Sequence, residues 1–235
     1  MEERRSISER LARIPPGRRL LPADFVARNQ RERILLAVAV LVSENGYPKT
    51  TIDAIAKTAR VALGTFYENF ASKEAAFLAA FDDSVELAAA SLAQLVDPRE
   101  PWPRQVATAL RGLLELIAAE PARARLCLVE ALGAGSAALE RYQAMLRRAA
   151  APLRAGRELN PRGASLPEGL ELAIAGGLAW LVYQRLTRAE QNGLDALLPE
   201  MLEIALTPYL GKEEAARAAA AERGDSKAAG EAGTS

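Results

Sequence analysis

The residues with the clearest capacity for chemistry lie between Thr50 and Phe77, in the run TTIDAIAKTARVALGTFYENFASKEAAF. Successive residues of an α-helix advance by about 100° around its axis. Phe66 and Phe70 therefore share one helix face, which we expect to be buried. The opposite face is small and polar, and it comprises Gly64, Thr65, Glu68 and Asn69.

A small polar helix face fits the major groove of duplex DNA, which is about 12 Å wide. We expect Gly64 and Thr65 to let the backbone approach DNA closely and Asn69 to pair with base edges. Tyr67 lies on the flank of this face, where its hydroxyl can reach a phosphate. Lys73 can do the same from the first turn of the next helix, whose free N–H groups favour the same anion.

Three helices are needed to hold this face in place. The sequence predicts a first helix from Asp24 or Asn29 to Asn45, ended by Gly46 and Pro48. Thr50 or Thr51 then acts as the N-cap of a second helix that ends near Ala59 or Arg60. A third helix covers 62–70, and Ser72 caps a fourth that runs to about Val96. Two short helices joined by a tight turn are helix-turn-helix geometry.

The remaining sequence predicts further helices and no strands, giving an all-α fold of about nine helices. Aromatic residues make up only 5% of the chain, so its core must consist mainly of Ala, Leu, Val and Ile. Ala and Leu are strong helix formers. The further helices are predicted over 102–119, 122–133, 136–155, 168–189 and 194–209.

Composition and breakers divide the chain into four predicted parts. Residues 1–24 are Arg-rich and lack periodicity, so we expect a flexible basic arm there, either a plain tail or a segment that tracks DNA. A DNA-binding domain over 25–80 and a larger helical domain over 81–210 follow. Residues 211–235 have no large apolar side chain, and we expect a disordered tail, or a fraying extension of the last helix up to Glu222.

Several classes of protein are excluded or disfavoured by composition. The chain has no histidine, which removes Ser-His-Asp catalysis and every His-containing metal site. Cys127 is the one cysteine, so no intrachain disulfide forms. We predict no catalytic residue, no metal site, no cofactor and no enzymatic activity. The longest apolar run, from Leu172 to Tyr183, is 12 residues, short of the ~20 that span a bilayer, and we expect a cytoplasmic protein without membrane partners.

The formal net charge is zero, yet charge is unevenly distributed. Residues 1–75 carry 13 Lys and Arg against 9 Asp and Glu, and the remainder carries 17 against 21. The N-terminal excess of four positive charges agrees with a polyanionic partner at that end.

Residues 31–78 resemble the DNA-binding domain of the TetR family of bacterial transcriptional regulators. The resemblance rests on Asn45-Gly46-Tyr47, Thr50-Thr51-Ile52, and the string GTFY from Gly64 to Tyr67 followed by Phe70 and Ser72-Lys73-Glu74. Two positions depart from the family pattern. Arg60 replaces the usual turn Gly, at a cost of ~1 kcal/mol if that position needs a positive φ. Ala62 replaces the usual Ser and removes an N-cap worth ~1 kcal/mol.

The resemblance implies a two-part homodimer whose N-terminal domain binds double-stranded DNA. It further implies a repressor that binds a pseudo-palindromic operator and responds to a small-molecule effector bound in the C-terminal domain. Base reading is assigned by position to Leu63, Gly64, Thr65 and Asn69. Phosphate contacts are assigned to Thr51, Tyr67 and Lys73.

The C-terminal part offers candidates for the effector pocket and for the dimer interface. Large or soft side chains line either a hydrophobic pocket or the core, and they are Trp102, Cys127, Tyr142, Met145, Trp180 and Tyr183. The resemblance places the last two predicted helices in the dimer interface. Gly176-Gly177 there marks a close helix crossing or a simple kink. The candidate interface residues are Ala173, Gly176, Gly177, Leu181, Leu198, Met201 and Leu202.

Two other functional classes are weighed against this interpretation. An enzyme lacks support, because the sequence has neither a paired-carboxylate motif nor a Gly-rich phosphate loop. A helical interaction module that no longer reads DNA is the alternative that the Arg60 and Ala62 departures keep open. Sequence-insensitive or absent duplex binding distinguishes that alternative.

Overall fold

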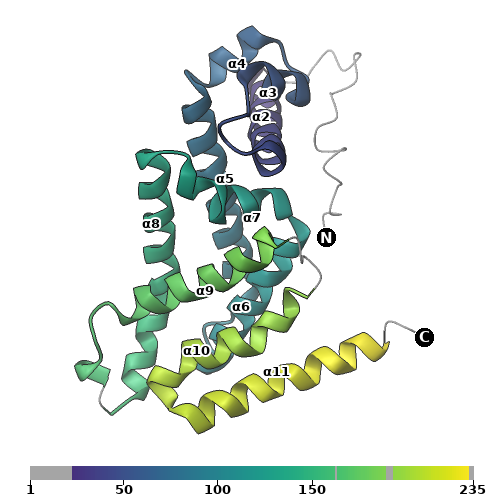
Figure 1. Cartoon of the computed structure of the whole chain (residues 1–235). Helices are drawn as coiled ribbons and strands as arrows, with labels where there is room; N and C mark the ends of the chain where they lie inside the picture. The colour runs from purple at the N-terminus through teal and green to yellow at the C-terminus, as the bar shows by residue number, and fades with distance from the viewer. Residues whose placement is uncertain (1–22, 162, 189–192, 233–235) are drawn as a thin grey trace. The chain divides into compact units, whose positions relative to one another are not determined.

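The computed structural model describes residues 23–161, 163–188 and 193–232, and throughout these residues the regular structure is helical (Figure 1). The described chain contains ten α-helices and four short 3-10 segments. The α-helices are α2 Ala23–Asn45, α3 Ile52–Ala59, α4 Leu63–Asn69, α5 Lys73–Leu95, α6 Trp102–Ala119, α7 Pro121–Leu128, α8 Ser136–Ala150, α9 Leu170–Thr187, α10 Leu198–Leu210 and α11 Lys212–Ala232. The 3-10 segments are η1 Glu130–Gly133, η2 Ala151–Leu159, η3 Gly163–Ser165 and η4 Asp195–Leu197. The predicted all-α fold is confirmed.

The chain folds into two compact units. The first holds the residues up to Val85 together with Ala122–Arg141, and the second holds Glu86–Pro121 together with the residues from Tyr142 onward. The division falls inside α5 and inside α8. The predicted domains 25–80 and 81–210 are each continuous in sequence, whereas each compact unit combines two segments, and the domain boundaries stay predictions. The predicted basic arm, residues 1–24, lies outside the described residues except for Ala23 and Asp24.

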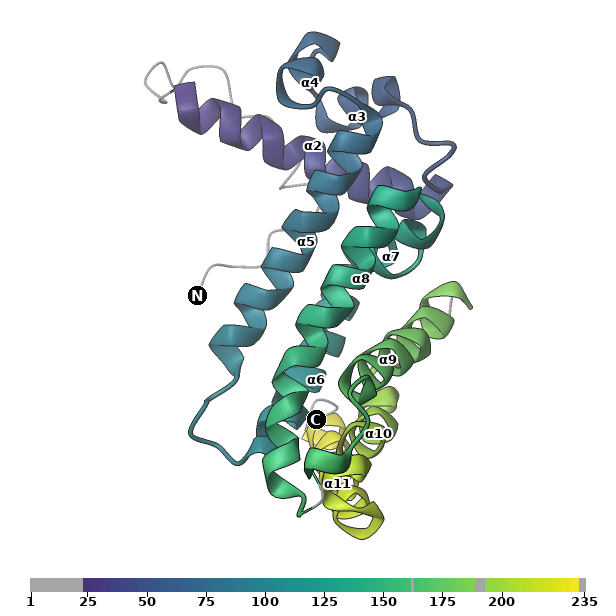
Figure 2. The ribbon, with the colours of Figure 1, turned by 90° about the vertical axis from the view of Figure 1, so that its left-hand side faces the viewer.

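The core of the first unit is built around α2. Ile34, Val38 and Val42 of this helix have at most 1% of their surface exposed, as expected for apolar residues spaced four apart. They are covered by α3 and α4, which pack on α2 (Figure 2). Gly46 has a φ of +80° and ends the helix, so the predicted stop is confirmed.

The short helices α3 and α4 begin and end in different ways. The Thr51 hydroxyl accepts a hydrogen bond of 3.2 Å from the Ala54 N–H and caps α3. Arg60 ends α3 in the left-handed conformation, with a φ of 55°, and Ala62 precedes α4 without any side-chain cap. The Ser72 hydroxyl accepts from the Ala75 N–H at 3.0 Å at the start of α5. The structure thus shows both effects predicted from the sequence: the position of Arg60 needs a positive φ, and Ala62 leaves the start of α4 without a side-chain cap.

The core of the second unit surrounds α10. Met201, Leu202 and Leu206 of α10 are at most 1% exposed. The helix packs on α6, η2 and α11, and α10 and α11 run side by side (Figure 1). Pro152 explains why the helix predicted over 136–155 changes character at Ala151, because a proline donates no helical hydrogen bond and restricts the residue before it.

The prediction of a disordered tail is wrong for residues 212–232. Gly211, with a φ of +82°, ends α10, and a separate helix, α11, follows. Ala215 and Ala219 are fully buried against α10, and buried Glu222 forms an ion pair with Arg111 of α6. Alanine side chains are small enough to let two helices approach closely, so a face without large apolar residues still packs.

A buried charge network ties η2 to α9 and α10. Arg157 donates to both carboxylate oxygens of Glu171, at 2.7 and 3.0 Å, and the Tyr209 hydroxyl donates to the same carboxylate at 3.1 Å. Arg157 also donates to the carbonyls of Gly163 and Leu166. The hydrogen bond from Arg157 lowers the pKa of Glu171, so this buried side chain stays ionised.

Within the described ranges, no helix combines the length and the apolar character needed to cross a membrane.

We predict that Ala62→Ser raises the free energy of unfolding by about 1 kcal/mol, because a serine hydroxyl at this position accepts a free N–H of α4. Urea denaturation followed by circular dichroism measures the change. Ala144→Ser is the matched control, because it adds the same hydroxyl at an exposed site inside α8, where no N–H is free. An equal effect of both substitutions contradicts the capping account.

We predict that Glu171→Gln lowers the free energy of unfolding at pH 7 by about 2 kcal/mol, because it leaves Arg157 without its charged partner. The pKa of Glu171 lies below its ordinary value of 4.5 in the folded chain. The stabilisation is therefore fully present above that value and is lost as the pH falls through the folded pKa. Denaturation of both proteins between pH 7 and pH 3 should show the difference shrinking, and a pH-independent difference contradicts the account.

Candidate nucleic-acid interface

Helix α4 has one buried face and one exposed face, as its sequence predicts. Phe66 is fully buried and Phe70 is 5% exposed, so both side chains belong to the core of the first unit. Leu63 and Tyr67 lie outward with 43% and 54% of their surface exposed. Gly64 is exposed as well, and a Cβ at this position meets no atom within 4 Å. The backbone of α4 is therefore open to a close approach from solvent.

Two further predicted base-reading residues, Thr65 and Asn69, are half-buried at the edges of this face. The Asn69 amide donates a hydrogen bond of 2.9 Å to the carbonyl of Thr65, one helical turn earlier. This bond fixes the orientation of the amide and leaves its oxygen and its second N–H without a bond to α4. Asn69 thus retains both a donor and an acceptor.

Lys73 is held against the loop that follows α2. Its ammonium group donates to the Tyr47 carbonyl at 3.0 Å and lies 4.3 Å from the centre of the Tyr47 ring. The Tyr47 ring in turn packs edge-on against Phe77 at 4.9 Å. An ammonium has three donors, so this positioned charge still has hydrogen-bonding capacity for a phosphate.

The same loop receives contacts that the sequence analysis missed. The Glu130 carboxylate of η1 accepts a hydrogen bond of 3.1 Å from the Tyr47 N–H. Arg125 of α7 donates to the carbonyl of Ser43, in the last turn of α2, at 3.3 Å. Pairs separated by more than 80 residues leave no local pattern in one sequence. In the first unit, α7 therefore contacts the end of α2, and η1 contacts the segment that joins α2 to α3.

The positive charges of the first unit near α4 come from three helices and one turn. Lys57 on α3 and Arg60 in the turn are exposed. Arg31 of α2 is exposed too, and its guanidinium lies 4.5 Å from the centre of the Phe70 ring. Together with Lys73 these groups give the surface near α4 several cations.

The predicted effector-pocket residues lie in different surroundings. Trp102 packs edge-on against Tyr209 at 5.2 Å and donates to the Pro152 carbonyl at 3.2 Å. A Cβ on Gly156 would lie 2.5 Å from the Trp102 ring, so the glycine allows this close packing. Trp102 is thus a packing residue of the second unit.

Cys127 belongs to the first unit, where it is 6% exposed. Burial raises the pKa of its thiol to about 12, so at neutral pH it is a protonated and unreactive side chain. The other candidates belong to the second unit: Tyr142 and Met145 are half-buried on α8, and Trp180 stacks on Tyr183 with ring centres 5.0 Å apart.

The candidate dimer residues divide into two groups. Leu198, Met201 and Leu202 of α10 are at most 5% exposed, so the structure places them in the protomer's own core. The candidates on α9 lie at or near the surface. Ala173 and Gly177 are exposed, and Gly176 and Leu181 are half-buried. Leu172 and Trp180 extend this exposed apolar face of α9, with 44% and 54% of their surface exposed.

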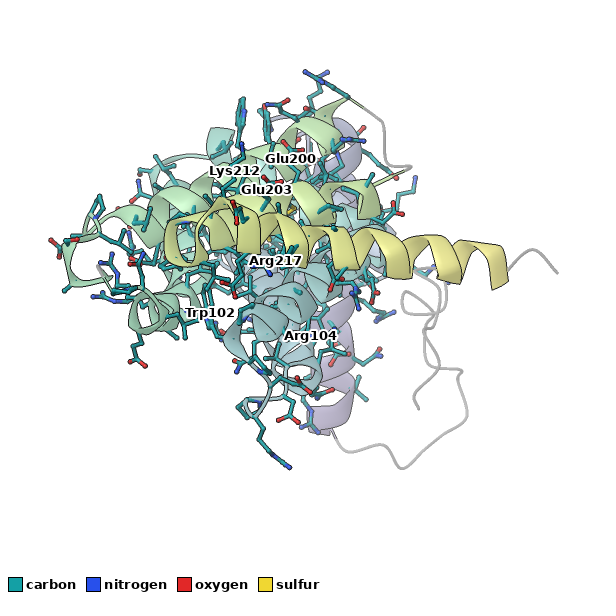
Figure 3. The ribbon with its side chains drawn as sticks, turned by 90° about the horizontal axis from the view of Figure 1, so that it is seen from below. Trp102, Arg104, Glu200, Glu203, Lys212 and Arg217 are labelled. Atoms are coloured by element: carbon teal, nitrogen blue, oxygen red, sulfur yellow. The ribbon has the colours of Figure 1, made fainter. Side chains whose placement is uncertain are left out.

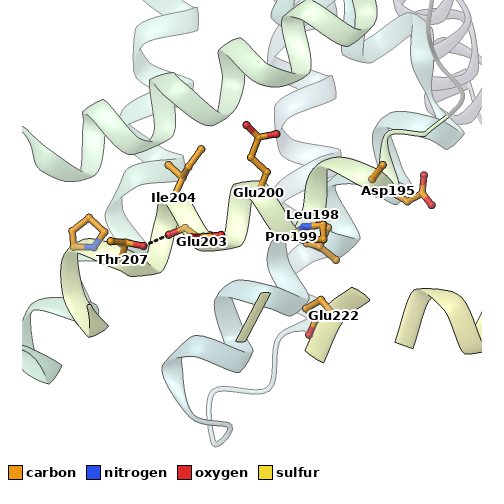
Figure 4. Close-up of a pocket in the computed structure, with 10 residues that line it drawn as sticks. Asp195, Leu198, Pro199, Glu200, Glu203, Ile204, Thr207 and Glu222 are labelled. Carbon is orange, nitrogen blue, oxygen red and sulfur yellow. Dashed lines mark hydrogen bonds between the residues drawn. The ribbon is translucent and has the colours of Figure 1, made fainter. Parts of the chain in front are cut away.

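A cavity of about 850 Å³ lies along α10, apart from the predicted effector-pocket residues. Leu198, Pro199 and Ile204 give it an apolar wall, and carboxylates surround that wall (Figure 4). Glu200 and Glu203 come from α10, beside α11 (Figure 3). The remaining carboxylates of the lining are those of Asp195 and Glu222. This surface is acidic and is unsuited to an anionic ligand.

In the described part of the chain, no three Cys, Asp or Glu side chains are grouped so that they would hold a metal ion.

Known proteins resemble the chain at two levels, sequence and fold. The sequence profile described as "Bacterial regulatory proteins, tetR family" matches residues 34–80. An uncharacterized HTH-type transcriptional regulator of Mycobacterium bovis is 29% identical over 135 residues. The match covers 55% of this chain and 62% of that relative, so it spans less than two thirds of the relative's length.

Two solved structures share the fold. The fatty acid degradation regulator FadR from Bacillus halodurans superposes with a TM-score of 0.66 at 20% identity, over 75% of this chain and 94% of that one. FadR from Bacillus subtilis, solved in complex with stearoyl-CoA, has a TM-score of 0.62 at 19% identity, over 76% and 97%. The profile match shows that residues 34–80, which include the helix-turn-helix formed by α3 and α4, are a domain of the TetR family of bacterial regulatory proteins.

Proposed function

We propose that this protein is a transcriptional regulator that binds duplex DNA through the exposed face of α4. The observation that carries the proposal is the division of α4 into a buried face, with Phe66 and Phe70, and an open face, with Leu63, Gly64 and Tyr67. A seven-residue helix with this division presents its outer side to the major groove. The match of residues 34–80 to the family profile supports the same assignment.

Contacts with bases and with phosphates have separate roles in this proposal. Leu63, Gly64, Thr65 and Asn69 read base edges, and phosphate contacts fix the position of the helix. Thr51, Tyr67 and Lys73 provide those phosphate contacts. The Thr51 hydroxyl oxygen already accepts from the Ala54 N–H, so it approaches a phosphate as a hydrogen-bond donor.

The regulator acts as a homodimer on a pseudo-palindromic operator. Two helix-turn-helix units related by a two-fold axis read two half-sites. The exposed face of α9 supports self-association, because Leu172, Gly177 and Trp180 form a neighbouring apolar set on one helix. This face provides the dimer contacts in our proposal, whereas the buried α10 residues support α9 from within the protomer.

A small hydrophobic effector controls DNA binding, and we infer that the protein is a repressor. The stearoyl-CoA bound to FadR of Bacillus subtilis supports an effector with a long apolar part. The acidic cavity along α10 repels an anionic ligand of that kind. We therefore keep the effector site near Tyr142, Met145 and Tyr183, and expect the effector to change DNA affinity through a coupling free energy of about 1–3 kcal/mol.

We predict that the double substitution Tyr67→Ala with Lys73→Ala weakens binding to all duplex sequences and lowers the salt slope. Loss of one phosphate-neutralising cation reduces the slope of log K against log salt by about 1. Fluorescence anisotropy with a random-sequence duplex at several salt concentrations measures both quantities. The substitution Lys212→Ala removes the same charge from exposed α11 and is the matched control.

Two outcomes contradict this assignment. Wild-type affinity and slope in the double variant show that these two side chains do not contact phosphates. Failure of the wild-type protein to bind duplex DNA at any salt concentration contradicts the proposed function itself and favours a helical interaction module. Circular dichroism of each variant confirms that the helices are intact.

A further inference from the structure

Arg60 is the one residue other than glycine with a positive φ in the part of the chain that the structure describes. Its φ and ψ are 55° and 44°, and its N–H bonds to the carbonyls of Ala56 and Lys57. The next N–H, that of Val61, returns to the Ala56 carbonyl at 3.0 Å. The hydrogen bonds that end α3 therefore require the left-handed conformation, which glycine adopts at a lower free energy than arginine.

No contact inside the described protein offsets this strain. The Arg60 side chain is exposed, and no acidic side chain among the described residues forms an ion pair with it. Lys57, one turn earlier on α3, is exposed as well. The turn between α3 and α4 thus carries an uncompensated cation at a position where arginine is disfavoured by the backbone. Backbone strain without a compensating contact inside the protein is found at binding sites, so the strained conformation of Arg60 points to a role in binding.

The position of Arg60 in the chain identifies what it binds. Leu63 is three positions after Arg60, so the two Cα atoms lie within about 11 Å of each other, and Leu63 is the first exposed residue of α4. A guanidinium presents two parallel N–H donors to a phosphate and remains charged at all physiological pH values. Any duplex read by α4 brings its phosphate backbone next to this turn.

We propose that Arg60 is a further DNA-contacting residue that binds a backbone phosphate beside the half-site read by α4. The inference rests on the proposed function and extends it to a residue at which the family pattern has glycine. The contact is with phosphate, so it raises affinity for all duplexes without selecting a base. Arg60 therefore lowers the stability of the free protein through its backbone and raises the affinity for DNA through its side chain.

The test compares stability with DNA affinity in the full-length chain. Arg60→Gly removes both the strain and the charge, and Arg60→Asn removes the charge while keeping a residue that tolerates the left-handed conformation. Arg60→Lys keeps the positive charge but removes the two parallel N–H donors of the guanidinium. Arg104→Asn removes an exposed arginine from α6 and is the control. Each protein is measured by thermal denaturation and by anisotropy with a random-sequence 30-base-pair duplex at several salt concentrations.

We expect opposite effects of Arg60→Gly on the two measurements. Its melting temperature should rise, while its affinity for the duplex falls about tenfold and the magnitude of its salt slope falls by about 0.9. Arg60→Asn should show the same loss of affinity and slope, and Arg60→Lys should keep the slope with an intermediate affinity. A residue with a purely structural role would change stability and affinity in the same direction.

The results separate this inference from the proposed function. If the wild-type protein binds the duplex, and Arg60→Gly and Arg60→Asn bind it with the same affinity and salt slope as the wild type, this inference is wrong and the proposed function still stands. Absence of duplex binding by the wild-type protein overturns the proposed function and this inference with it. An equal loss of affinity in Arg104→Asn shows a general charge effect and also overturns the assignment to Arg60.

Discussion

The candidate interface depends on the burial of Phe66 and Phe70 in the core of the first unit. Helix α4 has seven residues, and a helix this short does not persist in water on its own. Its stability and its orientation therefore come from the two aromatic side chains, which pack against each other with ring centres 5.9 Å apart. Because the helical period is fixed, burying them also determines that Gly64 and Tyr67 lie outward. One packing interaction thus creates the surface that we assign to DNA.

A second constraint acts on the segment around Tyr47. Lys73 at the start of α5 and Glu130 of η1 both bond to the Tyr47 backbone, one to its carbonyl and one to its N–H. The backbone N–H and carbonyl of Tyr47, just past the end of α2, thereby find hydrogen-bond partners on two elements that are distant in sequence. Within the first unit, this loop joins the helices matched by the family profile to a segment outside that match.

Much of the fold follows from local patterns in the sequence. The helix predicted over 102–119 has those bounds in the structure, because Pro101 precedes it and Pro121 follows it. The two faces of α4 follow from the spacing of Phe66 and Phe70. Caps at Thr51 and Ser72 were predictable because each hydroxyl lies directly before a helix that needs an acceptor.

Other features are beyond what one sequence reveals. Helix α11 was missed because Ala215 and Ala219 pack through small surfaces, which an analysis of large apolar residues does not detect. The period of α10 identified an apolar stripe with Met201 and Leu202, but period alone cannot distinguish a protomer core from a dimer interface. The contact between Glu130 and Tyr47 likewise joins residues 83 apart in the chain and has no local signal.

The most direct test of the central claim is selection of bound duplexes from a randomised DNA library, followed by sequencing. Two α4 helices in a two-fold dimer predict enrichment of an inverted repeat, with half-site centres about ten base pairs, or a multiple of that, apart. The selection is run with and without cell extract, so that an effector required for binding is supplied. An enriched inverted repeat in either condition supports the account. No enriched sequence in both conditions contradicts the claim that the exposed face of α4 reads DNA.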